Sequence, residues 1–341
     1  MCYTNDMETA LEMKIYNWKL FSRDVRRDVR NCVLLLFLFF LLNIIIILVM
    51  SAGTISSELF SDPDFLDKLA SSDGQEITEA ITDIADDSIG LMSIVAVVVS
   101  SLVFFILRKK RFITDLAAPM TEPLTPRIFI ILLLATQAIQ LVYSLLIMLV
   151  DNLLPEGLSL SESYGAAMDE LMTPTGLLYI ILIGPIFEEL IFRGAILGNL
   201  RRFGDNFAII FSSLLFGFYH GIFLQIPFAF IVGLLFGYVA VRWSLRVSIV
   251  LHIAVNGLST LVSDTGNEDL ATAGGLAMIA CTVLTVIFAI KWRKILKARM
   301  HSGAAYYKRT YRYGFSSVAF WIFILIMTGV GLMQLNTTPI L

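Results

Sequence analysis

The chain has 341 residues, of which 57% are hydrophobic and only 16% are charged, and its formal net charge is −3. A soluble domain averages about 45–50% apolar and about 25% charged residues, so this composition excludes an ordinary soluble domain and favours a membrane protein. The charge gives no indication of a nucleic-acid partner, and the three cysteines form neither a disulfide framework nor a CxxC metal site.

Nine apolar runs follow one another along the chain, separated by polar intervals. They cover residues 32–50, 89–107, 128–150, 175–200, 207–223, 228–241, 247–262, 271–290 and 315–333. A helix needs about 20 apolar residues to cross the core of a bilayer, and the fifth and sixth runs are shorter than that. The first run begins too late for an ordinary cleaved signal peptide. The pattern predicts an all-α, multi-pass transmembrane bundle of about nine spans.

Charged residues alternate in sign between these runs. Basic clusters fall at residues 14–30, 108–111, 201–202, 242–246 and 291–312, and acidic intervals fall at 53–88 and 151–174. Basic loops face the cytoplasm in membrane proteins. We therefore expect a cytoplasmic N-terminus in a multi-pass protein of the cell membrane. We expect the first acidic interval to be a solvated loop with a short helix.

These features divide the chain into four regions. Residues 1–31 form a basic cytoplasmic segment, and residues 32–124 form an accessory region of two spans with an acidic outer loop. Residues 125–265 form an intramembrane core, and residues 266–341 hold the C-terminal spans with a basic loop. The core contains the charged residues that are hardest to explain in an apolar setting.

The fourth run carries two adjacent carboxylates and a guanidinium. Glu189 and Arg193 are four residues apart with the acid first, the favourable order for an ion pair on a helix. Glu188 is rotated by about 100° and does not share that face, so it is free to meet another helix. Pro185 removes a helical hydrogen bond and should free a carbonyl near Ile181.

Two histidines and an asparagine lie in later runs. Glu188 precedes the turn at 203–204 by about 15 residues and His220 follows it by about 16, so both should lie about 23 Å along antiparallel helices. His252 and Asn256 share a helix face, but at about 9 and 15 Å beyond Arg246 they should be shallower. Tilt or a later helix start is needed to bring them in. Ionisable residues at membrane depth indicate function, and this set indicates a site that activates water.

Three short motifs resemble the CPBP (CAAX protease and bacteriocin-processing, or Abi) family, which includes the type II CAAX prenyl endopeptidases. They are EExxxR at residues 188–193, FxxxH at 216–220 and HxxxN at 252–256. Each motif is weak alone, but their order and spacing within apolar runs are specific. The resemblance covers about residues 125–265.

The resemblance implies an intramembrane endopeptidase acting on a membrane-associated, prenylated or otherwise lipophilic peptide in the bilayer. It implies Glu188 as the general base, His220 as the residue that binds or activates the water, and His252 and Asn256 as holders of the oxyanion. Glu189 and Arg193 would support these groups. Bacteriocin immunity and the maturation of membrane peptides are both compatible with the family.

Metal dependence stays open in the sequence. Glu188, His220 and His252 are acceptable zinc ligands, but no HExxH motif occurs, and Glu188 does not easily serve as both ligand and base. We favour the version without a metal. Other classes are a bis-histidine haem protein using His220 and His252, a proton-coupled transporter, and a non-catalytic immunity or scaffold protein. The haem reading leaves the glutamates and Arg193 unexplained.

Overall fold

The computed structural model describes residues 18–61, 74–108, 116, 118–120, 122–154, 159–169, 171–263, 268–300 and 304–335. Within these ranges every regular element is helical, which confirms the predicted all-α class. The elements are α2 (Trp18–Ser61), α4 (Gly74–Arg108), α6 (Pro126–Asp151), α7 (Leu160–Asp169), α8 (Pro174–Leu178), η1 (Tyr179–Ile183), α9 (Gly184–Glu189), η2 (Leu190–Leu197), α10 (Gly198–Leu200), η3 (Arg201–Phe203), α11 (Asp205–Tyr219), α12 (Gln225–Arg242), α13 (Leu245–Ser263), α14 (Glu268–Met300), α15 (Ala304–Gly314) and α16 (Val318–Leu335).

Five helical stretches in the described residues are long and apolar enough to cross a membrane. They are Leu20–Ser57, Ser88–Ile106, Pro126–Asp151, Pro174–Phe203 and Gln225–Arg242. A sixth arises if the bent pair Lys308–Gly314 and Val318–Met333 is one span. Three shorter apolar helices, Asp205–Tyr219, Leu245–Leu261 and Thr272–Ile287, coincide with the fifth, seventh and eighth predicted runs. The protein is a multi-pass helical membrane protein, and nine crossings stay a prediction.

The first two spans belong to helices much longer than the apolar runs. Helix α2 has 44 residues and continues the basic segment into the first span without a break. Helix α4 begins at Gly74, so residues 74–88 of the acidic interval are helical rather than mostly loop. Residues 75–89 contain neither proline nor glycine, the two residues that most readily interrupt a helix. Residues 62–73 lie outside the described ranges.

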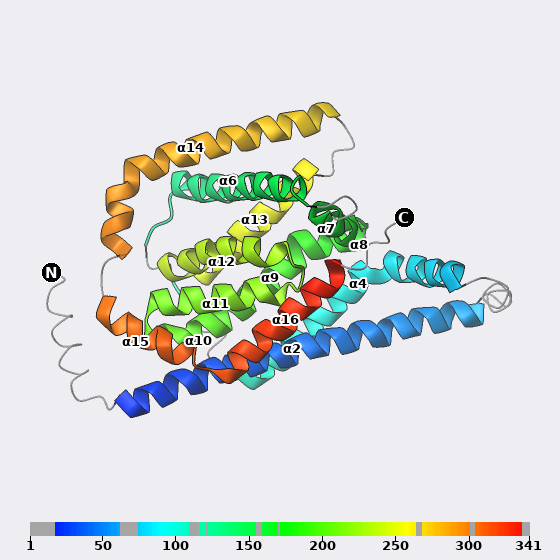
Figure 1. Ribbon diagram of the computed structural model, residues 1–341, viewed down its shortest axis with the longest axis horizontal. Helices are drawn as coiled ribbons and strands as arrows, with labels where there is room; N and C mark the ends of the chain where they lie inside the picture. The colour runs from blue at the N-terminus through cyan, green and yellow to red at the C-terminus, as the bar shows by residue number, and fades with distance from the viewer. Residues whose placement is uncertain are drawn as a thin grey trace.

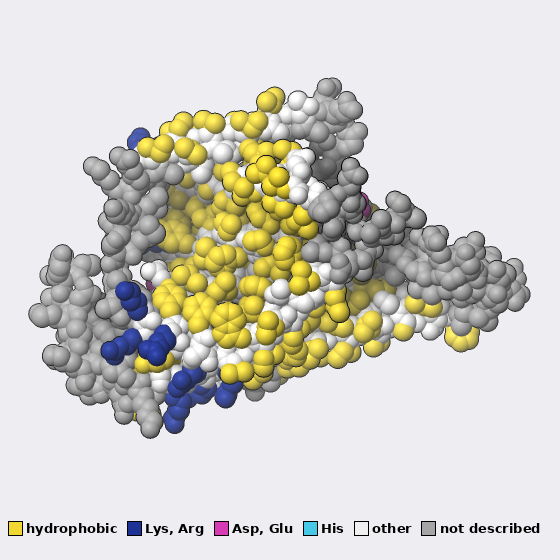
Figure 2. All heavy atoms as spheres, in the orientation of Figure 1, with side chains coloured by type: hydrophobic (Ala, Val, Ile, Leu, Met, Phe, Trp, Pro, Cys, Tyr) yellow, Lys and Arg dark blue, Asp and Glu magenta, His cyan; other side chains and the backbone are white. Residues whose placement is uncertain are grey.

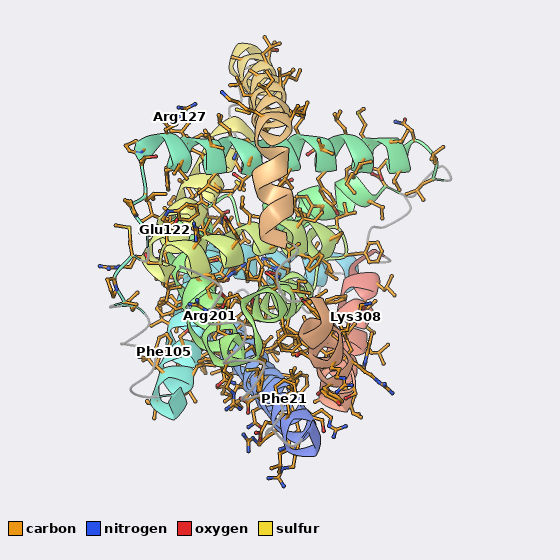
Figure 3. All side chains as sticks on the ribbon, turned by 90° about the vertical axis from the view of Figure 1, so that its left-hand side faces the viewer. Phe21, Phe105, Glu122, Arg127, Arg201 and Lys308 are labelled. Atoms are coloured by element: carbon orange, nitrogen blue, oxygen red, sulfur yellow. The ribbon has the colours of Figure 1, made fainter. Side chains whose placement is uncertain are left out.

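The helices run side by side and alternate in direction, as Figure 1 shows. Helices α2, α6 and α11 begin at the left-hand end of that view, where α4 and α12 finish. Lys and Arg side chains gather at the same end in Figure 2, beside a face covered by hydrophobic side chains. Seen from that end in Figure 3, Arg127, Arg201 and Lys308 come from three separate elements. The Lys and Arg side chains that the structure describes in this view therefore gather at one end of the bundle.

Two apolar clusters form the core of the described residues. One unites side chains of α2, α4, η2, α11 and α16, and the other unites α6, α12 and α13. Asp28 of α2 also pairs with Arg202 and accepts a hydrogen bond of 3.3 Å from Asn199. The first helix therefore packs directly on the core helices, and the division into four regions stays a prediction.

Membrane orientation can be tested with a matched pair of substitutions, made after the three native cysteines are replaced by alanine. Asn152 follows α6 and Asn206 lies in the first turn of α11, and both are exposed at opposite ends of the bundle. We expect Asn152→Cys to react with an impermeant maleimide on intact cells, and Asn206→Cys to react only after lysis, because basic ends face the cytoplasm. The reverse labelling would show an inverted protein, and labelling of both on intact cells would show that Pro174–Phe203 does not span.

Candidate active site

The helix that carries both glutamates is interrupted on either side of them. Two π-helical segments, η1 and η2, flank the six residues of α9. In this wider register the N–H of Gly184 donates to the carbonyl of Tyr179, five residues back. Pro185 has no N–H, so the next carbonyl, that of Ile180, loses its partner on the helix. Such π-helical turns occur often at functional sites.

Asn256 of α13 supplies the missing donor. Its Nδ2 donates to the Ile180 carbonyl oxygen at 3.0 Å. The sequence predicted a freed carbonyl near Ile181, and the wider register places it one residue earlier. This bond uses one of the two N–H groups of the carboxamide, so the second is available to a bound molecule. The bond also ties α13 to the helix of the glutamates, immediately before α9.

The predicted ion pair between Glu189 and Arg193 is confirmed. The guanidinium nitrogen lies 2.9 Å from Glu189 Oε1, and both side chains are fully buried. Arg193 also donates to the carbonyl of Gly233 at 3.1 Å and lies over the Phe216 ring at 4.2 Å from its centre. A Cβ on Gly233 would lie only 3.2 Å from the guanidinium, so glycine here permits the close approach.

Glu189 has two more partners, both on α13. The hydroxyl oxygen of Ser248 lies 2.6 Å from Oε2, and Nδ1 of His252 lies 3.1 Å from Oε1. The sequence analysis did not single out Ser248. Its signal was present, because Ser248, His252 and Asn256 are spaced by four residues and share a helix face. Glu189 is therefore held by three side chains and is withdrawn from the cavity.

His252 lies between the two glutamates. Because a carboxylate accepts hydrogen bonds, the contact with Glu189 puts a proton on Nδ1 and turns Nε2 towards Glu188, whose Oε2 is 3.8 Å away. The tilt that the sequence required to bring His252 to the level of Glu188 is therefore present. Helix α13 packs against α9 and η1 and is inclined to α6 in Figure 1, and rise along a straight helix does not capture that tilt.

His220 stands at the end of α11 rather than inside a span. The helix ends at Tyr219, and Gly221 has a φ of 65°, the left-handed conformation that commonly ends helices. His220 Nδ1 lies 2.8 Å from the carbonyl oxygen of Phe216, which accepts only, so Nδ1 carries the proton. Its Nε2 is left with a lone pair for a bound molecule.

One cavity brings the four predicted catalytic residues together. Its volume is about 500 Å³, and Glu188, His220, His252 and Asn256 all line it. Glu188 keeps 17% of its side chain exposed, whereas Glu189 has none. The antiparallel hairpin of the fourth and fifth runs does place Glu188 and His220 on one cavity, as predicted from their distances to the turn.

Glu188, His220 and His252, the possible zinc ligands, do not form a metal-binding group in this geometry. Among the described residues, no three His, Cys, Asp or Glu side chains are grouped closely enough to hold a metal ion. The carboxylate behind His252 is an arrangement that often supports a metal-bound histidine, and Nε2 of the ring faces Glu188.

The buried ion pair generates a stability prediction. Glu189→Ala should strand Arg193 in the core, and an unpaired buried charge costs about 3–5 kcal/mol, so we expect a large loss of folded protein. Glu189→Leu combined with Arg193→Leu removes both charges and should recover part of that loss. Thermal unfolding of the purified protein in detergent measures both effects. A double variant no more stable than either single one would contradict the pairing.

One comparison with known proteins gives a match. Residues 171–258 match the family model described as Type II CAAX prenyl endopeptidase Rce1-like. The matched segment runs through α8 to most of α13 and contains all three motifs. No curated protein and no solved structure matches the chain. The resemblance drawn from the motifs is confirmed, because residues 171–258 are similar to the CPBP family of intramembrane proteases.

Proposed function

We propose that the protein is an intramembrane endopeptidase that hydrolyses a peptide bond in a membrane-associated or lipidated peptide. A water molecule activated by Glu188 and His220 serves as the nucleophile. The observation that carries this proposal is the contrast between two adjacent carboxylates. Glu189 is fully buried and held by three side chains, whereas Glu188 opens on the cavity.

The free carboxylate suits the role of general base. Glu188 has no hydrogen bond to any residue in the described part of the chain, and His252 Nε2 lies 3.8 Å from its Oε2. A general base must be within hydrogen-bond reach of the water that it deprotonates. The lone pair of His220 Nε2 supplies a second contact for that water, because Nδ1 is bound to the Phe216 carbonyl.

The reaction follows from these positions. Glu188 takes a proton from the water as its oxygen bonds to the carbonyl carbon of the substrate. The resulting tetrahedral intermediate carries its negative charge on the former carbonyl oxygen. When the C–N bond breaks, Glu188 returns the proton to the leaving nitrogen. Proton transfer by a positioned side chain contributes typically about 10²–10⁴-fold to a rate.

Asn256 and His252 are placed to stabilise the intermediate. Asn256 has one amide N–H left after its bond to Ile180, and His252 donates from Nε2 when that nitrogen carries a proton. One such donor is typically worth about 3–4 kcal/mol in the transition state. Both side chains are anchored on the α9 side of the cavity, so their geometry is fixed before the substrate binds.

Two substitutions test the mechanism directly. Glu188→Gln and His220→Ala should each lower hydrolysis of a fluorogenic peptide with an isoprenylated cysteine at least about 100-fold. Protein abundance should stay near that of the unchanged protein, because neither side chain holds the bundle together. Glu122→Gln provides a matched control, since Glu122 pairs with Arg242 outside the cavity.

Retained turnover in both variants would refute the assigned roles. A Glu188→Gln variant that keeps its biological effect but hydrolyses no peptide would favour the scaffold alternative. The same variant also serves as a trap. We expect it to retain an uncleaved polypeptide that mass spectrometry identifies, and that the unchanged protein does not retain.

A further inference from the structure

The catalytic cavity has lining residues at one end of the bundle. We call the end at which Lys and Arg side chains gather in Figure 2 the basic end. Met168 of α7 and Leu171, which follows that helix, line the cavity, as do Ile222 and Gln225 where α11 connects to α12. In Figure 1, α7 and α8 lie at the end of the bundle opposite the basic end. The cavity therefore extends towards that opposite end.

Residue counts along three helices give a similar depth for the cavity. At about 1.5 Å per residue, Ser93, His220 and Gln225 lie about 22, 22 and 25 Å from the basic ends of α4, α11 and α12. The hydrocarbon core of a bilayer is about 30 Å thick, so these residues lie in the half far from the basic end. Helix α13 reaches the cavity after fewer residues because it is inclined, and its His252 still lies 3.8 Å from Glu188.

Packed side chains fill the space between Glu188 and the basic end. All eight residues of η2, the segment that continues from α9 towards that end, are buried. On the neighbouring α11, Phe207, Phe211 and Leu215 each have 0% of their surface exposed. Among the described residues, neither connection at the basic end, before α11 or before α13, contributes to the cavity lining. The cavity is therefore closed towards the basic end.

The charges of the connections indicate which compartment each end faces. The basic clusters at residues 201–202 and 242–246 belong to the closed end. Residues 151–174, which include Met168 and Leu171, are acidic and contain no Lys or Arg. Connections rich in Lys and Arg stay on the cytoplasmic side of a membrane. We therefore expect the closed end to face the cytoplasm and the cavity to face the opposite compartment.

We propose that the catalytic cavity receives both water and substrate from the non-cytoplasmic side of the membrane. The substrate is then a polypeptide segment exposed on that side. The proposal rests on the proposed function, because it assigns the substrate class of the same cavity. A cytoplasmic peptide would have to pass the packed layer of η2 and α11 to reach Glu188, whereas a peptide on the other side meets Met168 and Leu171 first.

Two serines of α4 give a matched test that needs no turnover. Ser93 lines the cavity, and Ser100, on the same helix face about two turns nearer the basic end, is 1% exposed. Ser93→Cys and Ser100→Cys are made separately after the native cysteines are replaced by alanine. The probe is an anionic, impermeant methanethiosulfonate, which reacts with the thiolate that forms in water and not with a thiol in an apolar interior.

We expect Ser93→Cys to react on intact cells at least about tenfold faster than Ser100→Cys, because only the first thiol meets water in the cavity. Asn152→Cys and Asn206→Cys serve as references for the two ends of the bundle. Reaction of Ser93→Cys only after lysis, as expected for Asn206→Cys, would overturn the proposal. So would equal rates for the two serine positions, or no reaction of Ser93→Cys before or after lysis, because water would then not enter the cavity from outside.

Turnover by intact cells tests the substrate class. The fluorogenic peptide carries a sulfonated, membrane-impermeant fluorophore and is added to cells that make the unchanged protein or the Glu188→Gln variant. We expect hydrolysis by intact cells with the unchanged protein, and none with the variant. Hydrolysis only after lysis would uphold the proposed function and overturn this proposal. Reaction of Ser93→Cys on intact cells, with no hydrolysis by intact or lysed cells, would support the orientation of the cavity and contradict the proposed function.

Discussion

The buried pair of Glu189 and Arg193 is the interaction on which the rest of the site depends. A charged group in an apolar interior is tolerated only when it is paired and hydrogen-bonded. Here the pair reaches three helices, because Arg193 donates to the Gly233 carbonyl of α12, and Glu189 is contacted by Ser248 and His252 of α13. The ion pair and hydrogen bonds of Glu189 thus position α12 and α13 around Glu188, which faces the cavity.

A second constraint comes from the break in helical hydrogen bonding before α9. Pro185 and the wider register of η1 leave the Ile180 carbonyl without a partner on its own helix, and Asn256 fills that role from α13. A buried carbonyl without a donor is costly in an apolar setting. The unpaired carbonyl of Ile180 would weaken an isolated helix, and here it holds Asn256 at the edge of the cavity. Structural need and the proposed catalytic placement coincide at this residue.

Much of this arrangement could be predicted from the sequence, because some constraints act over short distances along the chain. The spacing of four residues between Glu189 and Arg193 is enough to predict their pairing. The tight turn after the fourth run is enough to bring Glu188 and His220 to one cavity. Length and apolarity identify the long spans, although they say little of where α2 begins or of the helix in residues 74–88.

Other features depend on how helices cross, and sequence spacing carries no information on that. His252 reaches Glu188 because α13 is inclined, a tilt set by packing rather than by residue count. The contribution of Ile44 and Ile47 to the cavity lining could not be predicted for the same reason, since an apolar run shows no difference between a face turned to lipid and a face turned to a cavity. Ser248 was detectable in principle, but a serine in an apolar helix is an ordinary occurrence.

The central claim is that two adjacent glutamates have separate tasks, one holding the bundle and one activating water. Thermal unfolding of the isosteric variants Glu188→Gln and Glu189→Gln compares these tasks most directly. We expect an unchanged or higher midpoint for Glu188→Gln, because that carboxylate makes no hydrogen bond to the described residues that the substitution would break. It predicts a fall of about 6 °C or more for Glu189→Gln, from the loss of a buried ionic partner. Equal falls for both variants would contradict the division.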